Sequence, residues 1–203
     1  MDYESSQNGR IGCVSYSDWT EYPWKNEIAQ QRERIRQHYF EIVADAETEH
    51  NPHHMLERSI GILAICMRRM IECRLVTDKF RKTEIPVFEV PKLDEVRNFE
   101  SFLSSSGDKL PRIFDFSQRI RRLHTPASIS NKFLHARFLA ILSQSDYLPD
   151  GLLVASDHQS KNSLFHFTAT EFTGVIDAFL VDKVLEAKDW IDLDSGKSYA
   201  SRE

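Results

Sequence analysis

The chain has 203 residues, of which 26 are lysine or arginine and 31 are aspartate or glutamate, giving a formal net charge of -5. This length supports one domain with a real hydrophobic core, and a hydrophobic share of 41% excludes a disordered chain. The near balance of acids and bases argues against a dedicated nucleic-acid binder, which usually carries a large basic excess.

The sequence shows no signal for a membrane or for export. No apolar run approaches the roughly 20 residues that a membrane-spanning helix needs, and the first residues lack a basic start followed by an apolar stretch. On one continuous helix, Cys66 and Cys73 would lie about 10.5 Å apart in rise, too far for a disulfide. We therefore expect a cytoplasmic protein with reduced thiols and no membrane contact.

The first half of the chain predicts a helix hairpin. Residues 1–25 are polar and broken by glycine and proline, which indicates a flexible N-terminal arm. From Asn26, apolar residues recur at the spacing of one helix face: Ile28, Ile35, Tyr39, Ile42 and Ala46. Asn51 and Pro52 form an N-cap and a first helical residue, and a second apolar stripe runs to about Phe80. Because the link is short, the two helices should pack antiparallel.

The middle of the chain gives mixed signals. Residues 85–90 are β-prone and carry prolines near both ends, which suits an edge strand. A short helix is predicted over 93–103, and a helix after Pro111 is the favoured interpretation of 110–124. Thr125 followed by proline repeats the cap-and-proline signature and predicts a central helix over 127–144.

The last part of the chain predicts a β-hairpin and a final helix. The hairpin consists of strands at 152–155 and 164–167, and Thr168 and Glu171 form a capping box for the helix. The chain should therefore be mainly α, a helical bundle built on the antiparallel helix hairpin, with a small β-hairpin. We expect one mostly helical domain over 26–193 and a loose C-terminal tail over 194–203.

One polar pattern lies inside the predicted central helix. Ser130, Asn131, Lys132, Phe133, Leu134 and His135 follow one another there, and Asn131 and His135 are four residues apart, on one helix face. A histidine in this position can exchange a proton near neutral pH with a ribose hydroxyl. The pattern resembles the signature of HEPN domains, the higher eukaryotes and prokaryotes nucleotide-binding superfamily.

The resemblance implies a fold, an activity and site residues. HEPN proteins are helical bundles, many form dimers, and several are metal-independent ribonucleases that use an arginine, a polar residue and a histidine. It implies catalytic roles for Asn131 and His135, with Ser130 at the position where the family has arginine. The positive charge would then come from elsewhere, and the candidates for phosphate or nucleic-acid contact are Arg119, Arg121, Arg122 and Arg137.

Other interpretations of these polar groups stay open. Asn131 and His135 can also be hydrogen-bonded residues on a helix packed in the core. The cluster of His50, His53 and His54 between the first two helices matches no metal motif, and we interpret it as a solvated helix turn. We therefore expect no metal and no cofactor.

The sequence leaves two classes of function. The favoured one is a non-catalytic interaction or regulatory protein that acts through a protein partner or through self-association as a homodimer, using the exposed side of the helix hairpin. The alternative is a HEPN-like ribonuclease or an RNA-binding relative that uses His135 and Asn131.

Overall fold

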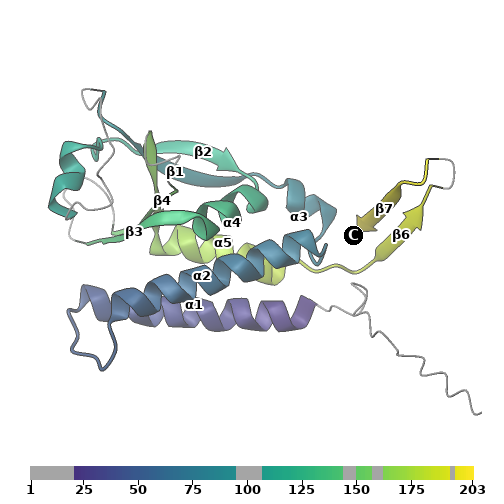
Figure 1. Cartoon of the computed structure of the whole chain (residues 1–203), viewed down its shortest axis with the longest axis horizontal. Coiled ribbons are helices and arrows are strands. Elements are labelled where there is room, and N and C mark those ends of the chain that lie inside the picture. The colour runs from purple at the N-terminus through teal and green to yellow at the C-terminus, as the bar shows by residue number, and fades with distance from the viewer. Residues whose placement is uncertain (1–20, 95–106, 144–149, 157–161, 193–194) are drawn as a thin grey trace, which may run out of the picture.

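The protein has an α+β fold in which helices cover one face of a five-stranded antiparallel sheet (Figure 1). This computed structural model describes residues 21–94, 107–143, 150–156, 162–192 and 195–203. The expected mainly α helical bundle is wrong, because a sheet lies at the centre of the fold. The bundle that the HEPN resemblance implied is therefore absent from the described residues.

The helix hairpin is present and consists of α1 (Glu21–Val43) and α2 (Pro52–Glu72), which lie side by side in Figure 1. Its second helix begins at the expected cap, since the His53 backbone N–H donates to the Asn51 side chain at 3.0 Å. It ends earlier than expected, because Thr77 caps a separate short helix, α3 (Asp78–Lys82). Of the expected arm, residues 21–25 belong to α1, and residues 1–20 lie outside the described residues.

The sheet has the strand order β2-β1-β5-β4-β3, with every neighbouring pair antiparallel. Its strands are β1 (Ile85–Pro91), β2 (Ile120–His124), β3 (Ala136–Leu142), β4 (Gly151–Ser156) and β5 (Ser163–Thr168). The predicted pairing of the segments that form β4 and β5 is confirmed. The strand β1 pairs on both sides rather than at an edge.

Two strands lie where helices were expected. The predicted central helix is a nine-residue helix, α4 (Pro126–Leu134), followed at once by β3. The apolar residues of this segment predicted a helix with several apolar faces, but part of them belong to β3. A strand that is partly buried on both faces has an almost continuous apolar run. Strand β2 occupies the end of the segment whose favoured interpretation was a helix, after a short 3-10 helix, η3 (Gly107–Arg112). The helix expected over 93–103 falls mostly on residues outside the described part.

Each face of the sheet has its own hydrophobic core. On one face, α1, α2, α4 and α5 (Ala169–Val181) pack against strand residues that include Val87, Phe165 and Phe167. On the other face, residues of the segment around η3 pack against Val90 and Leu164. The helix α5 begins with the predicted capping box of Thr168 and Glu171. The helical layer thus brings α1 opposite α5, although the two are far apart in sequence.

The C-terminal part forms a two-stranded ribbon, β6 (Ala187–Ile191) and β7 (Ser198–Arg202), beside the end of α2 (Figure 1). Arg74 Nη1 donates to the Ala200 carbonyl at 2.8 Å, and the Arg202 backbone N–H donates to Asp78 at 3.0 Å. Residues expected to form a loose tail therefore include a strand that is fastened to the domain. Across the described residues, none of the helices combines the length and apolarity needed to cross a bilayer.

Candidate functional site

The two residues predicted to be catalytic lie at the end of α4. His135 follows the last helical residue, and its backbone N–H donates to the Asn131 carbonyl at 3.0 Å. The Asn131 side chain is half-buried and accepts a hydrogen bond from Arg68 of α2, whereas His135 is exposed. The core interpretation therefore does not hold for His135, and an arginine does stand close to this pair.

These residues line a shallow space of about 410 Å³ that we call the α2–α4 hollow, formed by Ile65, Arg68, Arg69, Glu72, Asn131, Leu134 and His135. Arg68 is already engaged there, since its Nε donates to Glu72 at 2.6 Å while Nη1 binds Asn131. The hollow also lies at the C-terminal ends of α2 and α4, where the helix dipoles disfavour an anion. The ribonuclease hypothesis stays a prediction, since no finding tests it.

The four arginines predicted to contact phosphate do not share one surface. Arg121 and Arg122 are exposed on β2, at one edge of the sheet, while Arg137 is exposed on β3, at the opposite edge. Arg122 Nε lies 4.0 Å from a carboxylate oxygen of Glu89. The structure therefore separates Arg137 from the other arginines by the width of the sheet.

Arg119 belongs to an internal polar network. Its Nε donates to Nδ1 of the fully buried His166 at 2.9 Å, and its guanidinium pairs with Glu171 and lies 3.9 Å from the centre of the Phe88 ring. Burial alone would raise the pKa of Glu171, but hydrogen bonds from Arg119 and the Thr168 backbone hold that pKa below its usual value. Arg119 therefore fastens the N-terminus of α5 to the sheet.

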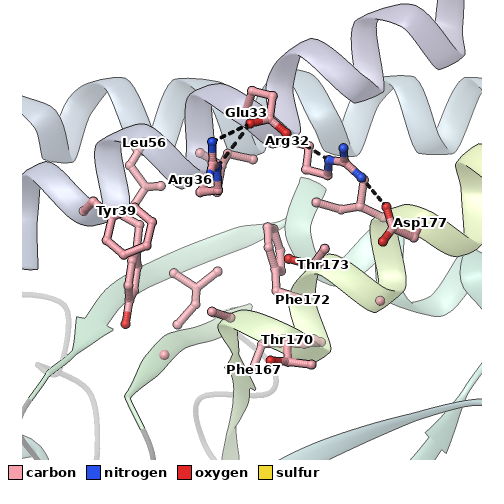
Figure 2. A pocket seen from close by; sticks show the side chains of 17 residues that line it. Arg32, Glu33, Arg36, Tyr39, Leu56, Phe167, Thr170, Phe172, Thr173 and Asp177 are labelled. Atoms are coloured by element: carbon pink, nitrogen blue, oxygen red, sulfur yellow. Dashed lines mark hydrogen bonds and ion pairs between the residues drawn. The ribbon is translucent and has the colours of Figure 1, made fainter.

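An open space lies between α1 and α5, and we call it the α1–α5 groove. It has a volume of about 810 Å³. In Figure 2, Tyr39 lies on its α1 side and Phe172 and Thr173 on its α5 side. Its other lining residues include Ile35, Phe40, Leu56, Gly151, Leu152, Phe167, Ala169, Thr170, Gly174 and Ile176. The groove is therefore lined mainly by aliphatic and aromatic side chains.

The charged residues of the groove are paired with one another (Figure 2). Arg32 pairs with Asp177 and so links α1 to α5, and Arg36 Nη2 lies 3.1 Å from the Glu33 carboxylate. Since two arginines face two carboxylates, the rim carries no formal net charge. Such a rim attracts neither anions nor cations from a distance.

Tyr39 differs from these paired groups. Across the described residues its hydroxyl forms no hydrogen bond, and its ring makes an edge contact with Phe40 at 5.9 Å between centres. Burial, and then the carboxylate of Asp150, raise the pKa of Tyr39 above its ordinary value. The phenol therefore stays neutral and able to donate at physiological pH.

Gly174 gives the α5 wall of the groove its open surface. A Cβ atom built at this position would meet no other atom within 4 Å, so packing does not require glycine there. Glycine inside a helix costs roughly 0.5–1 kcal/mol of stability relative to alanine. The helix carries this cost at a position where a side chain would extend into free space.

Metal chemistry finds no support in the described residues, where no three histidine, cysteine or carboxylate side chains come together as ligands. This includes the cluster of His50, His53 and His54. Burial, the largest cause, raises the pKa of Cys66 to about 11, so this thiol stays protonated in the core.

No family model matches the chain, and neither the curated proteins nor the solved structures contain a match to it. Only the geometry of the described residues therefore indicates a site. Sequence reasoning assigned Tyr39 to an apolar helix stripe and gave Gly174 no role. A glycine inside the predicted last helix is the sequence signal at this wall, but Gly61 in the second helix gives the same signal outside the groove.

Proposed function

We propose that this protein is a non-catalytic binding protein that holds an apolar ligand in the α1–α5 groove. The observation that carries the proposal is a space of about 810 Å³ lined by aromatic and aliphatic side chains with few polar groups. Ligand sites typically enclose roughly 300–1,000 Å³ and have this kind of lining. The paired rim charges fit a ligand whose binding depends on apolar contact rather than on ionic attraction.

The effect of Gly174 on helix stability also bears on the proposal. Filling the space beside this residue with a side chain would not clash, and replacing the glycine would favour the helix. Gly61 of α2 meets the same condition outside the groove, so Gly174 supports the proposal through the open lining beside it and not as a helical glycine alone.

A second candidate is protein binding through the outer face of the helix hairpin. Val43, outside the groove lining, is 42% exposed on α1, and Phe40, which belongs to that lining, is 59% exposed. Neighbouring exposed apolar side chains of this size are typical of interaction surfaces. This surface supports the partner-binding function expected from the sequence, and it meets the groove at Phe40.

The proposal is tested by titrating the protein with Nile red, a neutral dye that fluoresces in apolar surroundings. We expect saturable binding to the wild type and at least about tenfold weaker binding to Gly174→Leu, because the leucine side chain takes up part of the groove beside α5. Gly61→Leu is the matched control. Gly61 also lies inside a helix with no atom near its Cβ position, but on α2 and outside the groove lining.

The control should bind the dye as the wild type does. Equal binding by all three proteins, equal loss in both variants, or no binding by the wild type would contradict the groove as the ligand site. Gly174→Leu leaves Phe40 and Val43 unchanged, so a selective loss in this variant supports the groove rather than the outer face of the hairpin.

A further inference from the structure

We infer that Tyr39 selects the ligand of the α1–α5 groove, and that this ligand is an elongated apolar molecule with an uncharged end group that accepts a hydrogen bond. An amide or ester carbonyl has this chemistry. The inference rests on the proposed function and adds the class of ligand to it.

The first support is the state of the Tyr39 hydroxyl. It belongs to a side chain that lines the groove, and no other residue in the described ranges takes up its hydrogen bond. A phenol that is partly removed from water is stabilised by a hydrogen-bond partner, because a desolvated donor without an acceptor costs free energy. A ligand acceptor at that end of the groove would supply this partner.

The second support is charge. Burial, and after it the carboxylate of Asp150, opposes ionisation of the Tyr39 hydroxyl. The same field would oppose a carboxylate or phosphate end group at this place. The two arginines of the rim cannot offset this effect without leaving their present partners, Asp177 and Glu33. The electrostatics of the groove therefore favour a neutral end group over an anionic one.

The third support is shape. The α1 wall runs from Arg32 to Phe40, which corresponds to about 12 Å at the rise of an α-helix. Along this length the Arg32–Asp177 pair lies at one end, the Glu33–Arg36 pair near the middle and Tyr39 near the other end. Apolar side chains that include Leu56, Phe167 and Phe172 line the space beside them. A chain-like or flat apolar body with one polar end fits this arrangement better than a compact polar molecule.

The inference is tested by displacing Nile red with decanamide, decanoate and decylammonium, each below its aggregation concentration at neutral pH. These probes share one chain and differ in the charge of the end group. We expect decanamide to displace the dye at a concentration about fivefold or more below that of decanoate, the range of one hydrogen bond. In Tyr39→Phe, with each probe's affinity calculated from that variant's own affinity for Nile red, decanamide should bind about fivefold more weakly than to the wild type, because its carbonyl loses the hydroxyl donor.

The other outcomes overturn the inference in distinguishable ways. Equal displacement by decanoate removes the argument from charge, and a preference for decylammonium assigns selection to Asp150 instead of Tyr39. An affinity for decanamide that is the same in Tyr39→Phe as in the wild type removes Tyr39 from the selection. If the wild type binds Nile red, Gly174→Leu does not, and no probe displaces the dye, then the ligand class is wrong but the groove is still the binding site. Absence of dye binding to the wild type overturns both proposals.

Discussion

The α1–α5 groove and the α2–α4 hollow each lie between two helices, but they use their polar groups differently. In the hollow, Arg68 is shared between Glu72 and Asn131, and the space around it is shallow. In the groove, the charges pair at the rim, and the Tyr39 hydroxyl has no partner among the described residues. The hollow contains residue types that occur in catalytic sites, such as histidine, asparagine and arginine. The groove contains few such residues but offers the larger space for a ligand.

The difference teaches that residue type indicates a site only when the side chain is not already used by the fold. Arg119 illustrates this point, because its donors bind His166 and Glu171 inside the domain. From the sequence alone, an arginine that stabilises the fold cannot be distinguished from one that binds phosphate. The following predictions separate these two uses.

The largest effect should come from Arg119→Ala. This change leaves the buried Nδ1 of His166 without its donor and Glu171 without its cation, so we expect a loss of about 2–4 kcal/mol in the free energy of unfolding. Chemical denaturation of the purified variant measures it. A loss below about 0.5 kcal/mol would show that Arg119 is not committed to the fold, and would return it to the candidates for ligand contact.

A smaller effect should appear in acid through Glu171. Its pKa is lowered in the folded state, so its contribution to stability is complete above the ordinary glutamate pKa of about 4.3 and is lost as the pH falls through the lowered value. Thermal melts between neutral and acid pH should show a steeper decline in the wild type than in Glu171→Gln. Parallel curves for the two proteins would contradict the pairing with Arg119.

The smallest effect should come from His135→Ala. Since His135 is exposed and lies outside the core, we expect the free energy of unfolding to change by no more than about 0.5 kcal/mol. A loss of about 1–3 kcal/mol would instead indicate that this histidine is a hydrogen-bonded core residue. Cleavage of structured RNA in chelator by the wild type but not by the variant would give the hollow a catalytic use.

Local signals predicted the parts of the fold that depend on neighbours in sequence. The caps at Asn51, Thr125 and Thr168 each begin a helix where the pattern placed one. The helix hairpin follows from two apolar stripes with a short link, and the pairing of β4 with β5 follows from two β-prone segments. These features need no knowledge of the distant parts of the chain.

The sheet was missed where partial burial removed the pattern. Strand β3 is apolar along most of its length, so its periodicity does not distinguish it from a helix, and it begins one residue after His135. In strand β2, two consecutive arginines interrupt the alternation of apolar and polar residues that would indicate a strand. Without these two edge strands, only the β-hairpin and one short strand were expected, and a helical bundle with a small β element accommodated them.

The groove could not be predicted, because its walls meet only after the sheet has formed. Arg32 and Asp177 are 145 residues apart and pair across it. The stripe that contains Tyr39 indicated a buried helix face, and burial does hold for Ile28 and Ile35 on that stripe. Only the position of α5 decides that the next residue of the stripe borders open space.

The most direct test compares the two regions in one experiment. Backbone amide resonances of the isotope-labelled protein are assigned and followed by NMR while decanamide is added. The account predicts that the shifts concentrate at Tyr39, Thr173 and Gly174, with Asn131 and His135 unchanged. Shifts that concentrate at Asn131 and His135, or no shifts at either place, would contradict the groove as the binding site.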